Sequence, residues 1–111
     1  MENLKVAIGS DHGGFRYKEN IIDYLKSRNI EYIDVGTHTP ESCDYPEIAR
    51  NVAEKVISGQ VNRGILVCGT GIGMSLAANK VHGIRAALCG DTYSARVSRA
   101  HNNANVLCLG E

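Results

Sequence analysis

The chain has 111 residues, and its 12 Lys and Arg balance 12 Asp and Glu, so the formal net charge is zero. This balance argues against a nucleic-acid-binding protein and against an anionic-membrane-binding one, which usually carry a basic excess. The length fits a single domain over residues 1–111, and the chain has no apolar run long enough to span a membrane. The first residues lack the apolar core of a signal peptide, so we expect a cytoplasmic protein.

Short apolar runs, typical of strands, alternate with stretches whose apolar residues recur at helical spacing. The expected elements, in chain order, are a strand at 4–8, a helix at 15–28, a strand at 31–35, a helix at 46–57, a strand at 65–68, a helix at 74–80, a strand at 84–89, a helix at 92–101 and a strand at 106–109. Pro46 fits the start of its helix, and Asp91 or Thr92 can cap the last one. Lys18 interrupts an otherwise apolar helix face.

Strict alternation of strands and helices with short connections indicates an α/β fold with a parallel sheet. We expect a three-layer αβα sandwich with a doubly wound, five-stranded parallel sheet of Rossmann-like type. No helix follows the strand at 106–109, which leaves part of one sheet face uncovered. We therefore expect that a C-terminal helix is missing, or that a partner subunit supplies the cover.

Two loops at the carboxyl ends of expected strands carry unusual residues. The first places Asp11 and His12 between glycines, where a ligand can approach the backbone closely. An alternative reading is structural, with Asp11 capping the helix that follows and His12 merely beside it.

The second loop runs from Cys68 through Gly69, Thr70, Gly71, Ile72 and Gly73. Its glycines expose backbone N–H groups at the start of a helix, which favours a bound anion. It is not a Walker loop, because no Gly-Lys-Ser/Thr follows, and it is a poor dinucleotide fingerprint, because Met74 stands at the place of the third glycine. A thiolate at Cys68 is favoured near a helix N-terminus, and it suits removal of a proton from carbon while amides hold the resulting enediolate. The alternative is a glycine turn that serves helix packing.

A third polar cluster, His101, Asn102 and Asn103, ends the last helix and lies at the opposite, amino edge of the sheet. If it takes part in catalysis, it must act across a dimer interface; otherwise it is a helix C-terminus with turn-forming residues. Tyr45 can border the pocket or serve packing. The four cysteines form no CxxC pair, so we expect no metal site.

The segments GSDHGGF, DYP, GILVCGTGIGMSLAANK, GIRAALC and SRAHNNANVLCLG resemble the ribose-5-phosphate isomerase type B family, which also includes galactose-6-phosphate isomerase subunits. The resemblance spans the whole chain. It implies interconversion of ribose 5-phosphate and ribulose 5-phosphate by a homodimer with shared active sites, without metal or organic cofactor. Family members continue beyond this chain with a tail whose arginines bind the substrate phosphate.

The resemblance also implies roles for individual residues. In members with the CGTG segment the cysteine, here Cys68, is the base. Other members use a Glu at the place of Met74, and a methionine cannot act as a base. Thr70 and the amides of Gly69, Gly71, Ile72 and Gly73 hold the enediolate, and His101 of the partner subunit opens the sugar ring opposite Asp11. His12 lies near the phosphate, and Tyr45, Asn102 and Asn103 line the pocket.

Two other functions are compatible with the residues. One is a non-catalytic phosphate- or nucleotide-binding module, which needs the glycine loop but neither Cys68 nor His101. The other is a subunit of a galactose- or allose-6-phosphate isomerase.

Overall fold

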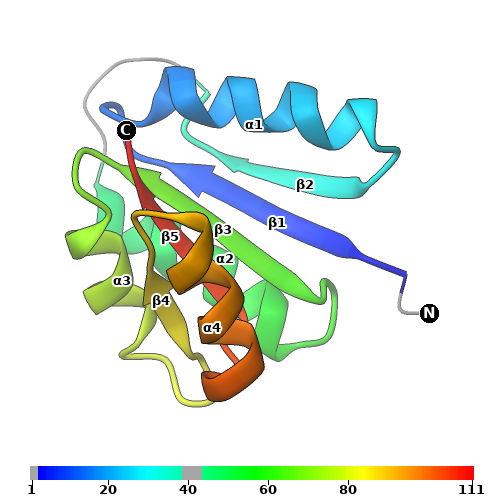
Figure 1. The fold of residues 1–111 in the computed structure, drawn as a ribbon. Helices are drawn as coiled ribbons and strands as arrows, with labels where there is room; N and C mark the ends of the chain where they lie inside the picture. The colour runs from blue at the N-terminus through cyan, green and yellow to red at the C-terminus, as the bar shows by residue number, and fades with distance from the viewer. Residues whose placement is uncertain (1–2, 39–43) are drawn as a thin grey trace.

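The computed structural model describes residues 3–38 and 44–111. In these residues five strands alternate with four helices, as Figure 1 shows. In chain order they are β1 (Lys5–Ser10), α1 (Phe15–Ser27), β2 (Glu31–Gly36), α2 (Tyr45–Ile57), β3 (Arg63–Cys68), α3 (Ile72–Ala78), β4 (Ala86–Leu88), α4 (Thr92–Asn102) and β5 (Val106–Gly110).

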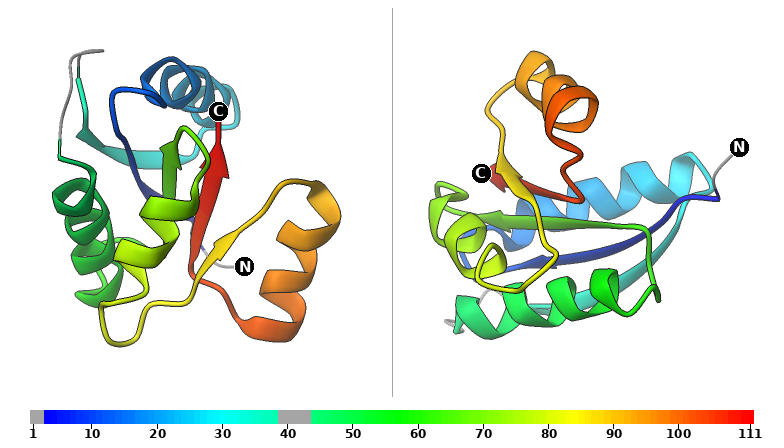
Figure 2. Two further views of the ribbon diagram at one scale, coloured as in Figure 1. Left: turned by 90° about the vertical axis from the view of Figure 1, so that its left-hand side faces the viewer. Right: turned by 90° about the horizontal axis from the view of Figure 1, so that it is seen from below.

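All strand pairs are parallel, and the strands lie in the order β2-β1-β3-β5-β4. Helices α1 and α4 cover one face of the sheet and α2 and α3 the other, which the right-hand view of Figure 2 shows most clearly. The predicted doubly wound, three-layer α/β fold is therefore confirmed. The chain reverses its winding direction between β1 and β3, and ligands bind beside such reversals, at the carboxyl ends of the strands.

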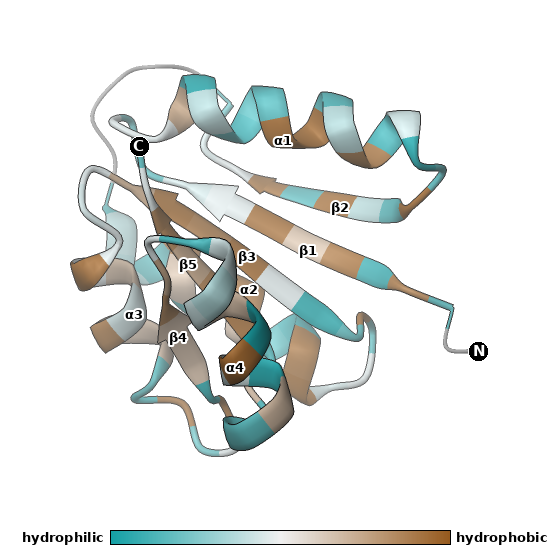
Figure 3. Ribbon diagram, in the orientation of Figure 1, coloured by the Kyte–Doolittle hydropathy of each residue, from teal (hydrophilic) through white to brown (hydrophobic). Residues whose placement is uncertain are grey.

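The hydrophobic core is densest between the sheet and the α2–α3 layer. Apolar colour concentrates on the central strands in Figure 3, whereas the outward face of α1 is largely polar. The buried side chains of this cluster are Ala7, Ala49, Val52, Ala53, Val61, Leu66, Cys68, Met74, Ala78, Ile84, Val106 and Cys108. This layer anchors β3 and α3, and it therefore fixes the loop between them.

The opposite face is less well covered, because α4 carries no fully buried residue. Two cavities, of about 740 and 430 Å³, lie along this face, and both are lined by Ala95 and Leu107. Ile65, Leu107 and Leu109 of the central strands are only partly buried there. This is the region that the sequence predicts to be uncovered.

Among the element boundaries that differ from prediction, those of α3 and β4 have a clear physical cause. Helix α3 begins at Ile72 rather than at 74 and ends at Ala78 rather than at 80, because Gly71 adopts a positive φ of 82° and turns the chain directly into the helix. Strand β4 spans three residues rather than 84–89, because the N–H of Arg85 donates to the side chain of Asn105 instead of joining the strand ladder. The helical spacing of Ile57 with Val52, Ala53 and Val56 suggests a buried position, but Ile57 is 49% exposed because it is the last residue of α2.

Among the described residues, no helix combines the length and the apolar character that crossing a membrane requires.

Candidate active site

Two loops meet where β1 and β3 end. Ser10 pairs with Val67 in the parallel ladder, and the N–H of Asp11 donates to the carbonyl oxygen of Val67 at 3.2 Å. A Cβ on Gly14 would lie 2.7 Å from that same oxygen, so only glycine lets the first loop approach this closely. The Asp11–His12 loop and the Cys68–Gly73 loop are therefore neighbours, as predicted from the edge they share.

Asp11 has a structural task in this loop. Its Oδ1 accepts a hydrogen bond from the N–H of Gly14 at 2.9 Å, which closes the turn into α1. Gly14 rather than Asp11 occupies the N-cap position. Asp11 is partly buried, and His12 is exposed at the same edge. Asp11 therefore closes the turn before α1 rather than capping the helix itself, and this contact uses only one of its two carboxylate oxygens.

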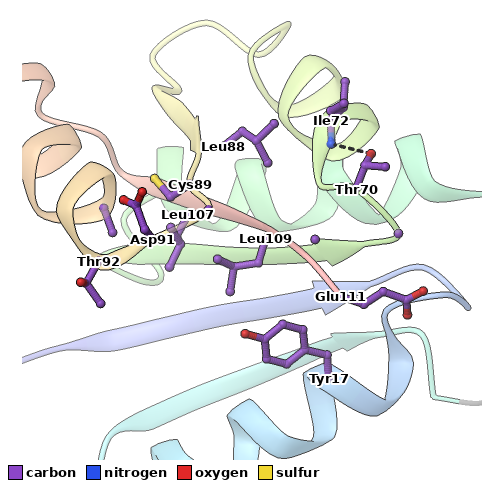
Figure 4. Close-up of a pocket in the computed structure, with 14 residues that line it drawn as sticks. Tyr17, Thr70, Ile72, Leu88, Cys89, Asp91, Thr92, Leu107, Leu109 and Glu111 are labelled. Atoms are coloured by element: carbon purple, nitrogen blue, oxygen red, sulfur yellow. Dashed lines mark hydrogen bonds between the residues drawn. The ribbon is translucent and has the colours of Figure 1, made fainter.

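The Cys68 side chain is 6% exposed and packs in the core cluster with Met74. Its sulfur accepts a hydrogen bond from the N–H of Gly71 at 3.0 Å. The N–H of Ile72 donates to Oγ1 of Thr70 at 3.2 Å, the dashed line in Figure 4. Two of the amides expected to face a ligand are thus directed at side chains of their own loop.

Tyr45, the first residue of α2, lies against the same loop. A Cβ on Gly73 would lie 2.9 Å from Cε1 of Tyr45, so the ring sits over the first turn of α3. Both residues line a cavity of about 770 Å³ between α2 and α3. The structure therefore brings Tyr45 to the loop that follows Cys68, and its role in bordering a substrate pocket stays a prediction.

The 740 Å³ cavity reaches the loop from the other face of the sheet, where Gly69 and Thr70 line it (Figure 4). Glu111 also lines this cavity, and its N–H donates to the carbonyl oxygen of Cys68 at 3.0 Å. Oε1 of Glu111 is 3.9 Å from where a Cβ on Gly13 would lie. No spacing or motif in the sequence marked Glu111 as a neighbour of both loops.

His101, Asn102 and Asn103 lie far from these loops within the chain. They end α4, just before β5 begins with Val106, which pairs with Gly64 near the start of β3. That is the amino edge of the sheet, opposite the end of β3 at Cys68. His101 and Asn102 are exposed. The structure therefore confirms the placement predicted for this cluster and does not bring it to Cys68.

Asn103 is held in place by its own helix end. It adopts a left-handed φ of 52° as the C-cap, and its Oδ1 accepts a hydrogen bond from Nη1 of Arg99 at 3.2 Å. The same guanidinium donates to the carbonyl oxygen of Ala104. Asn103 therefore acts as a turn-forming residue at the helix C-terminus, which is the alternative to a catalytic role for this cluster.

The described cysteines Cys68, Cys89 and Cys108 are free thiols, and Cys43 lies outside the described residues. Burial, with further contributions from Cys68 and Cys89, raises the pKa of Cys108 to about 12, so Cys108 is a neutral core thiol. Within residues 3–38 and 44–111, no group of three or more His, Cys, Asp and Glu side chains could hold a metal ion.

The sequence also gave only a partial signal for Lys18. Lys18 stood out because it interrupts the apolar face of the first helix, but the sequence spacing did not indicate which residue forms its ion pair. In the structure its side chain is completely buried, and Nζ lies 2.9 Å from both carboxylate oxygens of Asp34 within β2.

A doubly wound α/β protein with two glycine-rich loops and a cysteine at the carboxyl edge of its sheet belongs to the class that binds small anionic ligands at the winding reversal. Residues 6–111 match the family model described as Ribose/Galactose Isomerase. The chain belongs to this family and is an isomerase.

Individual relatives agree with this assignment. The chain is 56% identical over 109 residues to a putative sugar phosphate isomerase of Bacillus subtilis, covering 97% of this chain and 73% of that protein. It is 52% identical over 106 residues to ribose-5-phosphate isomerase B of Escherichia coli, covering 96% of this chain and 71% of the relative. The structure of ribose-5-phosphate isomerase B from Clostridium thermocellum superposes with a TM-score of 0.96 at 59% identity, covering 97% of this chain and 73% of the other.

Proposed function

We propose that this chain is an aldose–ketose isomerase that interconverts ribose 5-phosphate and ribulose 5-phosphate. The observation that carries the proposal is the hydrogen bond from the Gly71 N–H to the sulfur of Cys68 at the carboxyl edge of the sheet. This contact fixes the position of the sulfur in the loop, and the thiolate form of a cysteine is the form that accepts a proton. The relatives from Escherichia coli and Clostridium thermocellum, which bear the name ribose-5-phosphate isomerase B, support the choice of substrate.

In the proposed reaction, the Cys68 thiolate takes the proton from C2 of the open-chain aldose and returns it to C1. A proton moves from the C2 hydroxyl to the carbonyl oxygen at C1, so an enediolate forms and collapses to the ketose. Thr70 and the amides of Gly69 and Gly73 hold the negative oxygens of that enediolate. The Gly71 and Ile72 amides, also expected in this role, are directed at Cys68 and Thr70 of their own loop instead. The oxidation of one carbon balances the reduction of its neighbour, so the chemistry requires no external electron acceptor or metal.

The opening of the sugar ring is assigned to two residues from different subunits. His101 of a second subunit and Asp11 of the first face each other across the ring, so the working unit is a homodimer with shared sites. The support for a second subunit is the position of His101. It is exposed at the edge of the sheet opposite Cys68, so it cannot reach the Cys68 of its own chain. The short edge strand β4 and the exposed Leu76 and Leu88 leave apolar surface near α3 for such a contact.

Four further residues are proposed to bind the sugar phosphate. His12 lies nearest the phosphate, at the exposed corner of the first loop, and Tyr45 borders the sugar over Gly73. Asn102 and Asn103 of the second subunit complete the pocket.

We also propose a cytoplasmic location for the enzyme, since Cys68, Cys89 and Cys108 are free thiols and reducing compartments keep thiols in that state.

The test is conversion of ribose 5-phosphate to ribulose 5-phosphate by the purified chain in the presence of a chelator, followed in both directions. We expect turnover that disappears in Cys68→Ala. Turnover of galactose or allose 6-phosphate alone would replace the substrate proposed here with a hexose phosphate. Binding of ribose 5-phosphate without turnover, unchanged in Cys68→Ala, would instead establish a phosphate-binding module.

A further inference from the structure

Lys18 is the one charged side chain in the buried core of the described residues. Its Nζ lies 2.9 Å from Oδ1 and 2.9 Å from Oδ2 of Asp34, and 3.1 Å from Oε1 of Glu19. The Phe15 ring lies against the same ammonium, with 5.4 Å between Nζ and the ring centroid. A buried ammonium without partners is strongly unfavourable, and an apolar side chain would fill the same space at lower cost. The buried Lys18–Asp34 ion pair is therefore expected to have a role other than stabilising the fold.

Its position suggests what that role is. The N–H of Lys18 donates to the carbonyl oxygen of Gly14, so Lys18 lies one helical turn behind the Asp11–His12 loop. Asp34 lies within β2, two residues before its end, and its Oδ1 also accepts a hydrogen bond from the N–H of Gly36 at 3.0 Å. One residue further on, the N–H of Thr37 donates to the carbonyl oxygen of Ser10 at 2.8 Å, directly before Asp11.

We propose that Lys18 and Asp34 are positioning residues of the isomerase site. Lys18 fixes the carboxylate of Asp34, Asp34 fixes Gly36, and the Thr37–Ser10 hydrogen bond then ties the segment leaving β2 to the first loop. Since Ser10 directly precedes the first loop, the buried pair sets the position of that loop, and with it His12, relative to the substrate. The inference rests on the proposed function of the site.

The same geometry separates binding from chemistry. Cys68 is anchored by the Gly71 N–H, and Asp11 by the Val67 carbonyl, and neither contact involves Asp34. Loss of the pair should therefore displace the binding residues and leave the proton-transferring group in place. In kinetic terms, KM rises while kcat is retained.

The experiment compares Lys18→Met/Asp34→Leu with the parent, with Lys18→Arg, and with Lys26→Met as the matched control on the exposed side of α1. An apolar pair restores packing, so the double variant should keep the parental melting temperature. We expect its KM for ribose 5-phosphate to rise about tenfold or more with kcat within about threefold, whereas Lys18→Arg stays near parental KM. A folded double variant with parental KM overturns the proposal.

Two additions keep the test decisive. If the double variant does not fold, Asp34→Asn takes its place, and a parental KM in that variant overturns the proposal. Amide hydrogen exchange at Gly36 and Thr37 measures, without any substrate, how firmly their hydrogen bonds to Asp34 and Ser10 are held. We expect exchange there to be about tenfold faster in the double variant, with the core amide of Leu66 unchanged. Unchanged exchange at Thr37 overturns the inference even if the substrate proposal fails, so the two failures are distinguishable.

Discussion

The backbone N–H of Gly71 points at the sulfur of Cys68, with 3.0 Å between the two atoms. The contact depends on the positive φ of Gly71, which turns the chain back over the end of β3 before α3 begins. A residue with a side chain would resist that turn, and its amide would point elsewhere. The backbone conformation of Gly71 therefore positions the Cys68 sulfur, and substitutions at either residue test this hydrogen bond.

Replacing Cys68 by Ala should remove the proton acceptor while the fold survives. We expect ribose 5-phosphate turnover to fall by about 10²–10⁴-fold or more, the range typical of a lost general base. Cys108→Ala is the matched control, because Cys108 is a buried neutral thiol in the same sheet and should cost stability rather than turnover. Coupled-assay rates and circular-dichroism melts decide the result. Near-parental rates in Cys68→Ala would disprove the proposed mechanism.

A shared site predicts complementation between two inactive chains. Cys68→Ala and His101→Ala each lack one half of a site, so a mixed dimer regains one intact site out of two. After unfolding and refolding together in equal amounts, we expect about a quarter of parental turnover, since half of the dimers are mixed. Refolding each variant alone provides the baseline. No activity in the mixture, although mixed dimers are detected by mass spectrometry, would place His101 outside the catalytic site.

Gly71→Ala should be destabilising for two reasons. Its φ of 82° is unfavourable for a residue with a Cβ, which costs about 1–3 kcal/mol. The new Cβ would also lie 2.5 Å from Cδ1 of Leu88 and 2.9 Å from the carbonyl carbon of Leu109. Chemical denaturation should show the loss, and turnover should fall with it. Gly90→Ala is the control, because nothing lies within 4 Å of its would-be Cβ; equal stabilities of the two variants would contradict the clash.

The N-cap of α4 should make stability depend on pH. The Ser94 N–H, and then the Ser94 hydroxyl, donate to Asp91 and hold the pKa of that carboxyl below its ordinary value. A lowered pKa in the folded state means that the carboxylate stabilises the protein above about pH 4, its unfolded value, and that this contribution is lost as the pH falls through the folded value.

Urea denaturation of the parent and Asp91→Ala should therefore show a difference in unfolding free energy near neutral pH that shrinks in acid. Asp23→Ala, which removes an exposed carboxylate from α1, is the control. If the difference in unfolding free energy stayed constant with pH, the contribution of Asp91 to stability would not depend on the charge of its carboxylate, contrary to the prediction.

The elements themselves could be predicted because each carries its own local signal. The apolar run ending at Cys68 gave β3, and the alternation along the chain gave the parallel sheet and its doubly wound class. The placement of His101 at the amino edge followed from topology alone, since a helix that precedes a parallel strand must end where that strand begins.

Other features required knowledge of contacts between distant residues. The partner of Lys18 is sixteen positions away on another element, and no periodicity links it to Asp34. The true ends of β4 depend on the side chain of Asn105, which lies beyond the following helix. The start of α3 at Ile72 depends on a backbone conformation at Gly71 that the glycine permits but does not dictate.

Strand β5 comes after every other described element in the chain, yet it lies between β3 and β4. During synthesis on the ribosome, β1, β2 and β3 can assemble early with α1 and α2, whereas β4 has no neighbour to pair with until Val106–Gly110 emerges. Gly110 then packs against the backbone of Thr70, where even a Cβ would lie 3.0 Å from the Thr70 oxygen. A nascent chain therefore completes the support of its cysteine loop only when the last strand has been inserted.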